Sequence, residues 1–164
     1  MEELTLSNGS EEEYKILCRE IPELFFAENY AQIKEDPNLN FIVFKKDETL
    51  VGGSVYLVTT HRPNPENFPV NRIVLFPAVY GETFGIVPEY RGRGFGTQAL
   101  QLREEWVKEK HDAVLLALKA IDRKAMKWFM DRGYKDVGDS LGPTSLVKYF
   151  GDRYEQKLRK EGLI

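Results

Sequence analysis

The chain has 164 residues, of which 42% are hydrophobic and 12% aromatic, enough to build one sizeable core but too few for two. Its formal net charge is −3, so no overall positive field favours nucleic acid or an anionic membrane as a partner. The single cysteine, Cys18, excludes an intramolecular disulfide and disfavours a cysteine-based metal site. We therefore expect one cytoplasmic domain, residues 1–164, without a metal.

The N-terminal third begins with an acidic segment, MEELTLSNGSEEE, and the chain has no run of about 18 apolar residues, so we expect neither a signal peptide nor a membrane span. Residues 4–6 predict a short strand. Ser10 precedes three glutamates, the pattern of a helix start, and this helix should run to about Ile21. Between Pro22 and Pro37 we expect a second, weaker helix.

Two runs rich in β-branched and aromatic residues, FIVFKK and TLVGGSVYLVTT, are joined by Asp47-Glu48 and predict a hairpin. The segment after them, HRPNPENFPVN, contains three prolines and His61, and it predicts a surface loop. We expect His61, like His111 further on, to be an ordinary surface residue.

The second half alternates strands and helices. VYGETFGIV predicts a strand, and the next helix should bury Phe95, Ala99, Leu102 and Trp106 while the charged residues 103–110 face solvent. AVLLAL is typical of a strand covered on both sides, Asp122 and Gly133 bracket a short helix, and YKDVG and SLVKYF predict two last strands around a turn at 139–144. The fold class is therefore mixed α/β.

One turn in the middle of the chain, EYRGRGFGTQAL, holds Gly92, Gly94 and Gly96 together with Arg91 and Arg93. It lies between a predicted strand and a predicted helix. A helix N-terminus exposes backbone N–H groups and the positive end of the helix dipole, which favour phosphate. Glycines let an anion approach those amides, and arginines add charge. The turn therefore predicts a pyrophosphate-binding site.

Other glycine motifs fit this turn less well. The dinucleotide pattern fails because Thr97 stands where its last glycine belongs, and the P-loop fails because Gly-Lys-Ser/Thr is missing. RNA-binding Arg-Gly tracts are repeated, whereas this one occurs once. A purely structural turn with solvated arginines stays open as the alternative.

Residues 84–100, FGIVPEYRGRGFGTQAL, resemble the acyl-CoA-binding signature of the GNAT superfamily of N-acetyltransferases, in which Arg91, Gly94 and Gly96 take the fixed positions of Arg/Gln-x-x-Gly-x-Gly/Ala. Residues 122–134, DRKAMKWFMDRGY, resemble a later segment of the same family. The resemblance covers residues 41–150 best. It implies a mostly antiparallel mixed sheet of about six or seven strands, splayed after the fourth and flanked by about four helices.

The resemblance also implies that acetyl-CoA is the co-substrate. The residues expected to bind it are Ile86, Val87, Arg91, Gly92, Arg93, Gly94, Phe95, Gly96, Thr97, Asp122 and Arg123. Asp122 departs from the usual Asn, and its charge would repel a nearby phosphate. The backbone N–H near Ile86 or Val87 should donate to the acetyl oxygen and to the developing oxyanion.

Catalysis requires a base, because an amine of pKa about 10.4 is protonated at neutral pH. Glu82 on the strand before the signature matches the position at which many family members carry it, although a salt-bridged or solvated face residue is the alternative reading. Strand alternation places Tyr80, Glu82, Phe84 and Ile86 on one face unless a bulge intervenes. Phe129 stands where many members have a proton-donating Tyr. A thiolate is a fair leaving group without an acid, and Tyr80, Tyr30 and Tyr90 are conceivable substitutes.

Together these residues predict an enzyme that moves an acetyl group from acetyl-CoA to an amine of a small molecule or peptide. Two alternatives stay open: a non-catalytic acyl-CoA-binding or regulatory module, and an interaction domain that binds no CoA. We expect no nucleic acid or membrane partner, and a monomer or homodimer. Residues 22–36, 60–80 and 138–145 are expected to select the acceptor.

Overall fold

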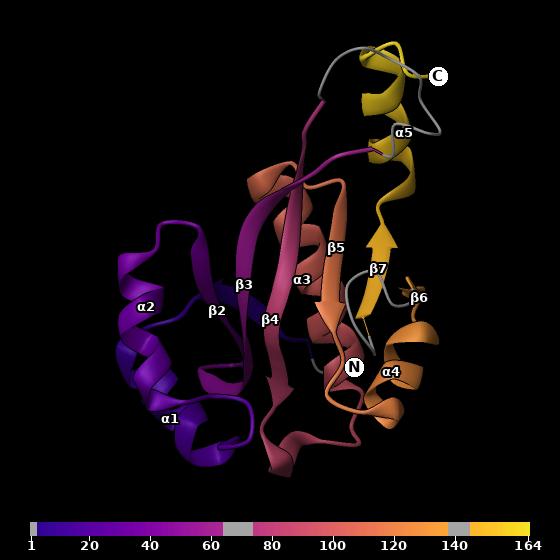
Figure 1. Cartoon of the computed structure of the whole chain (residues 1–164). Helices are drawn as coiled ribbons and strands as arrows, with labels where there is room; N and C mark the ends of the chain where they lie inside the picture. Colours follow the sequence, from indigo (N-terminus) through magenta and orange to yellow (C-terminus); the bar gives the residue numbers. More distant parts are fainter. Residues whose placement is uncertain (1–2, 64–73, 138–144) are drawn as a thin grey trace. The chain divides into compact units, whose positions relative to one another are not determined.

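The computed structural model describes residues 3–63, 74–137 and 145–164. It has the predicted mixed α/β fold, with seven strands in one mixed sheet of order β1-β2-β3-β4-β5-β7-β6 (Figure 1). The strands are β1 (Thr5–Asn8), β2 (Leu39–Lys46), β3 (Thr49–His61), β4 (Phe76–Ile86), β5 (Leu115–Lys119), β6 (Lys135–Asp136) and β7 (Ser145–Tyr149). The helices are α1 (Glu11–Glu20), α2 (Tyr30–Glu35), α3 (Phe95–His111), α4 (Arg123–Met130) and α5 (Gly151–Lys160), with 3₁₀ turns η1 (Ala27–Asn29) and η2 (Pro88–Tyr90).

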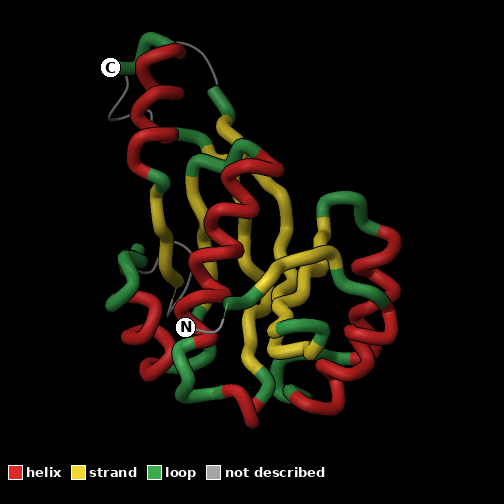
Figure 2. Tube along the Cα trace, turned by 180° about the vertical axis from the view of Figure 1, so that it is seen from behind, coloured by secondary structure: helices red, strands yellow, loops and turns green. Residues whose placement is uncertain are grey.

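The chain forms two compact units. The first comprises Met1–Leu57 and Gly81–Trp106, and the second comprises Val58–Tyr80 and Val107–Ile164. Strands β3 and β4 and helix α3 contribute residues to both. Figure 2 shows the helices, strands and loops along the chain. Within the described ranges, no helix is both long and apolar enough to cross a membrane.

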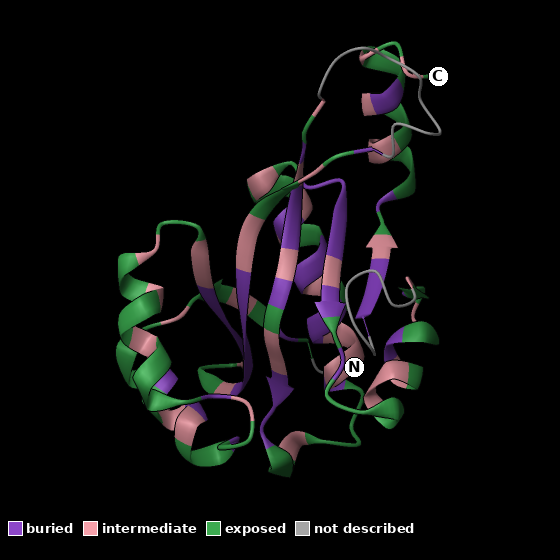
Figure 3. Cartoon of the chain, viewed as in Figure 1, coloured by how far each residue is buried: buried purple, intermediate pink, exposed green. Residues whose placement is uncertain are grey.

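Helix α1 begins where the sequence predicts. Ser10 Oγ accepts a hydrogen bond of 3.2 Å from the Glu13 amide, and Glu13 Oε1 accepts one of 3.0 Å from the Ser10 amide, which completes a capping box. Buried Tyr14, Leu17 and Ile21, spaced by three and four residues, lie on one face of the helix and its C-cap (Figure 3). They pack with Phe25, Phe41, Val43, Val55 and Val87 in the core of the first unit.

The weaker helical segment predicted between Pro22 and Pro37 is confirmed in part: η1 and α2 span Ala27–Glu35, whereas residues 22–26 are not helical. Phe25, 1% exposed, inserts its ring beside Tyr14, with the ring centroids 5.8 Å apart. The next residue, Phe26, has extended backbone angles, and its carbonyl accepts a hydrogen bond of 2.9 Å from the Tyr14 hydroxyl. Burial of the Phe25 ring therefore overrides helix propensity at this point.

The predicted hairpin of β2 and β3 is confirmed, with Lys46 opposite Thr49 and Asp47 in the left-handed region at φ 48°. Strand β3 continues through His61, so His61 lies in a strand and not in the predicted loop. Within the second unit its ring contacts those of Tyr149 and Tyr154. Most of the predicted proline-rich loop lies outside the described residues. The predicted turn at 139–144 lies wholly outside them.

Helix α3 buries only part of the predicted face. Phe95 and Ala99 are buried as predicted, at 1% and 0% exposed, and Leu102 and Trp106 are only half-buried. Arg103 and Glu104 are instead buried, at 1% and 7% exposed. Arg103 Nη1 donates to Ser54 Oγ at 3.0 Å, and the guanidinium lies 4.7 Å from the ring centroid of Phe84. The prediction that residues 103–110 face solvent is therefore wrong for the first two of them. A long aliphatic stem and a flat guanidinium let arginine pack against an aromatic ring.

The second unit contains helix α5, which the sequence analysis missed. Strand β7 pairs antiparallel with β5, with Val147 opposite Ala117, and Leu158 of α5 packs into the same core. Arg153 and Lys157 of α5 both reach Asp112, at 2.8 and 2.7 Å, and the pKa of that carboxyl is lowered by these cations. Tyr154 and Leu158, four residues apart in a charged segment, were the overlooked signal.

Candidate functional site

The glycine turn has the backbone that its sequence predicts. Gly92 and Gly94 have φ of 73° and 83°, angles that residues with a side chain rarely adopt, and helix α3 begins at the following residue, Phe95. Apart from the glycine itself and its two chain neighbours, no atom of the described residues lies within 4 Å of where a Cβ would stand on either glycine. This open backbone before a helix N-terminus fits a pyrophosphate, whose oxygens can approach the amides of the first helical turn.

The two arginines of the turn have different surroundings. Arg91 donates from Nε to the carbonyl oxygen of Ile86 at 2.8 Å, and its Nη2 lies 3.5 Å from Glu23 Oε1. The guanidinium of Arg93 lies 5.5 Å from the ring centroid of Tyr90 and 5.3 Å from that of Phe95. Both side chains are exposed, so both can meet a phosphate in solvent.

The end of β4 carries the predicted oxyanion donors. The Val87 amide donates to the carbonyl oxygen of Val51 at 2.8 Å, so sheet pairing already occupies it. The oxyanion donor that the sequence analysis expects near Ile86 or Val87 stays a prediction. Both residues are buried, at 8% and 5% exposed, which keeps this part of the strand in an apolar environment.

Glu82 lies in the middle of β4 and lines a pocket of about 240 Å³ within the first unit. Its side chain is exposed, no described residue bonds to its carboxylate, and partial desolvation raises its pKa above the ordinary value of 4.5. Thr83 lines the same pocket, although ideal alternation places consecutive residues on opposite faces. Thr83 Oγ1 also accepts from the Val55 amide at 2.9 Å, so the ladder is irregular here.

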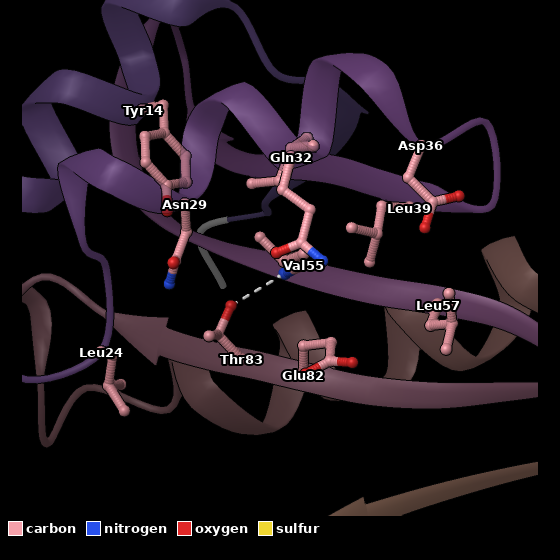
Figure 4. Close-up of a pocket in the computed structure, with 11 residues that line it drawn as sticks. Tyr14, Leu24, Asn29, Gln32, Asp36, Leu39, Val55, Leu57, Glu82 and Thr83 are labelled. Carbon is pink, nitrogen blue, oxygen red and sulfur yellow. Dashed lines mark hydrogen bonds between the residues drawn. The ribbon is translucent and has the colours of Figure 1, made fainter.

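Figure 4 shows how the pocket is assembled. Asn29 and Gln32 come from the η1–α2 segment and Asp36 follows it, while Val55 and Leu57 come from β3 and Glu82 and Thr83 from β4. The remaining lining residues are Tyr14, Leu24, Ile33 and Leu39. The pocket thus has an aliphatic floor with amides, a hydroxyl and two carboxylates around it, a lining suited to a small polar ligand with an apolar portion.

Four predicted site residues belong to the second unit. Tyr80 is half-buried on β4. Asp122 caps α4, since its Oδ1 accepts from the Ala125 amide at 2.7 Å, and Arg123 beside it is exposed. Phe129 is 8% exposed, and its ring packs on Trp128 and Tyr134, with centroids 5.0 and 5.4 Å away, so it serves the core of α4.

The sequence profile of the Acetyltransferase (GNAT) family matches residues 10–134, about three quarters of the chain. The chain belongs to this family. Among solved structures, GNAT proteins share its fold. An acetyltransferase from Thermus thermophilus is 17% identical, with a TM-score of 0.64, and the match covers 90% of this chain and 97% of that one. A putative acetyl transferase from Pyrococcus furiosus is 28% identical, with a TM-score of 0.58 and coverage of 82% and 94%.

A third similar structure is a mutant of the AtaT toxin bound to the C-terminus of the antitoxin AtaR and acetyl-CoA. It is 13% identical, with a TM-score of 0.61 and coverage of 94% and 97%. GNAT membership thus indicates the fold and the general chemistry of acetyl transfer. The identity of the acceptor must be inferred from the residues of this chain. The predicted acceptor-selecting range 22–36 supplies Asn29, Gln32 and Asp36 to the pocket, although the sequence analysis singled out none of them. It missed Thr83, because no motif marks this residue and only tertiary packing brings it to the pocket.

Proposed function

We propose that this protein transfers the acetyl group of acetyl-CoA to an amine of a small molecule or peptide by direct attack in a ternary complex. The observation that carries the proposal is Glu82, a carboxylate with a raised pKa that lines a pocket on the strand leading into the glycine turn. From Glu82 to Ile86 the strand runs about 13 Å. Strand β4 thus carries Glu82 and leads through η2 into the phosphate-binding turn.

The turn would hold the pyrophosphate of acetyl-CoA. The absence of atoms around Gly92 and Gly94 leaves room for phosphate oxygens, and the first amides of α3 have no intrahelical acceptor. Arg91 and Arg93 supply charge at the rim. Hydrogen bonds to a charged group contribute roughly 1.5–3 kcal/mol each, so a few amides and one arginine account for micromolar binding.

Glu82 would take a proton from the ammonium form of the acceptor, directly or through water. The free amine nitrogen then forms a bond to the thioester carbonyl carbon, and the amide of Ile86 stabilises the oxygen that becomes negative. Collapse of this intermediate breaks the carbon–sulfur bond and releases CoA as thiolate. The nitrogen loses its second proton to solvent, which leaves an N-acetylated product.

No hydroxyl stands at Phe129 to protonate the leaving sulfur. A thiol of pKa near 8.5 leaves adequately as the thiolate, so the reaction proceeds without that acid. The apolar ring is also the feature that favours the alternative function, a non-catalytic acyl-CoA-binding module. Binding and turnover must therefore be measured separately.

The test combines an acetyl-CoA titration with a panel of amines assayed for released CoA. Glu82→Gln should lower turnover by roughly 10²–10⁴ and leave acetyl-CoA affinity unchanged. Glu48→Gln is the control, because Glu48 is exposed in the β2–β3 turn. Acetyl-CoA binding without CoA release from any amine would favour the non-catalytic module, and full turnover in Glu82→Gln would exclude Glu82 as the base.

A further inference from the structure

The pocket on the first unit presents two carboxylates from opposite walls. Asp36 follows α2, and Glu82 lies on β4 (Figure 4). The described lining residues include no lysine, arginine or histidine. An anionic ligand would therefore find no compensating charge here, whereas a cation would find two.

The carboxylate of Asp36 is held in place by its own turn. Its Oδ1 accepts a hydrogen bond of 2.9 Å from the Asn38 amide, and the Asp36 amide donates to the Gln32 carbonyl at the end of α2. No described residue bonds to the other carboxylate oxygen. Asp36 is half-buried, so solvent screens it less than it would a fully exposed carboxylate.

Between the two carboxylates the pocket is aliphatic. Leu39, Val55 and Leu57 line it, and of these Val55 is 5% exposed. Methylene groups placed there lose contact with water, which favours binding in proportion to the area buried. A volume of about 240 Å³ is that of roughly eight water molecules, enough for a short aliphatic chain.

We propose that the acceptor is an aliphatic diamine or polyamine without a carboxylate, with its reacting amine at Glu82, its second cationic group at Asp36 and its methylenes on Leu39, Val55 and Leu57. This inference rests on the proposed function, because Glu82 is assigned there as the base. It excludes free amino acids, since their carboxylate would face Asp36 and Glu82 without a cation to pair with it.

Three probes of equal chain length test the proposal: cadaverine, pentylamine, which lacks the second amine, and L-lysine, which adds a carboxylate. Binding to the protein loaded with CoA is measured by calorimetry, and turnover by released CoA. Cadaverine should bind at least tenfold more tightly than either of the others. Equal affinity for cadaverine and pentylamine, or tighter binding of lysine, would overturn the proposal.

The variant Asp36→Asn keeps the oxygen that accepts from Asn38 and removes the charge. It should weaken cadaverine binding about tenfold, leave pentylamine binding unchanged and retain the melting temperature. Glu35→Gln, at the exposed neighbouring residue, is the matched control. Unchanged cadaverine binding in Asp36→Asn would overturn the assignment. Selective cadaverine binding without CoA release would support the pocket and refute the transferase function.

Discussion

Arg91 Nε donates a 2.8 Å hydrogen bond to the backbone carbonyl oxygen of Ile86, the last residue of β4. One side chain of the glycine turn is therefore fastened to the strand that also carries Glu82. The same guanidinium extends Nη2 toward Glu23, 3.5 Å away in the exposed segment after α1. Arg91 thus has a structural bond at Nε and a solvent-facing end available to an anion.

Arg91→Lys separates these two roles. Lysine keeps the positive charge but lacks the Nε donor, so the Ile86 carbonyl loses its side-chain partner. We expect the free energy of unfolding to fall by about 1 kcal/mol and acetyl-CoA affinity to fall several-fold. Urea unfolding and calorimetry measure the two quantities. Arg19→Lys, on the exposed last turn of α1, should change neither. Loss of affinity without loss of stability would show that the Ile86 bond contributes little.

Gly94→Ala tests the backbone of the turn. At φ 83° an added Cβ meets no neighbour, so the cost is backbone strain of about 1–2 kcal/mol, without a clash. Acetyl-CoA affinity should fall at least tenfold, about 1.4 kcal/mol. Gly162→Ala is a matched control, because Gly162 has φ 71° and is equally open but lies near the C-terminus. It should lose similar stability and keep full affinity. Unchanged affinity in Gly94→Ala would refute the pyrophosphate assignment.

Arg103→Ala should lower the free energy of unfolding by about 3 kcal/mol, because it opens a cavity beside Phe84 and removes the donor to Ser54. Chemical denaturation measures the change. Gln101→Ala, exposed on the same helix, should stay within about 0.5 kcal/mol of the wild type. A loss equally small for Arg103→Ala would contradict the packing described here.

Asp122→Ala removes the N-cap of α4 and should lower stability by about 1 kcal/mol. Asp122→Asn keeps a side-chain oxygen that can accept from Ala125, and it should restore most of that loss. If Asp122 also lies near a bound phosphate, Asp122→Asn removes a repulsive charge and raises acetyl-CoA affinity. Equal stability of the Ala and Asn variants would show that the cap contributes nothing.

The raised pKa of Glu82 predicts how stability changes with pH. Desolvation favours the neutral carboxyl in the folded protein. The group therefore contributes to the free energy of unfolding below the ordinary pKa of 4.5, and this contribution is lost as pH rises through the raised pKa of the folded state. Glu82→Gln cannot ionise. It should match the wild type in melting temperature at low pH and exceed it near neutrality. A constant difference at every pH would contradict this origin.

Turnover should depend on the ionisation of Glu82 with the opposite sign: it should rise with pH where the stability contribution falls. The base works only when ionised, so wild-type turnover falls as pH drops through the raised pKa of Glu82. In Glu82→Gln only the ionisation of the amine should shape the profile. Identical pH–turnover profiles in the wild type and Glu82→Gln would show that another group causes the fall in turnover at low pH.

Local signals in the sequence predicted the elements that depend on local interactions. The Ser10 cap, the turn at Asp47 and the Asp122 cap each involve residues within a few positions of one another, and each is present as expected. The glycine turn was readable for the same reason. Its conformation depends on residues without a Cβ and needs no distant partner.

Features set by tertiary packing were not readable. A charged run on a helix normally indicates a solvated face. The residues next to Arg103 in the sequence do not predict its contacts with Ser54 and Phe84, which are distant in the chain. The pocket joins Asp36, Leu57 and Glu82 from three distant segments. Likewise, the backbone at Phe25 is not helical, although the composition of its segment favours a helix, because the Phe25 ring is buried in the core of the first unit.

Helix α2 has only six residues and no side-chain hydrogen bond at its N-cap, so its own sequence specifies it weakly. It nevertheless supplies one wall of the pocket, while the glycine turn that would bind the donor belongs to another segment. Substitutions in and around α2 can therefore alter which acceptor fits without altering donor recognition. Changes in and around α2 would therefore diversify the acceptor proposed for this protein and leave β4 untouched.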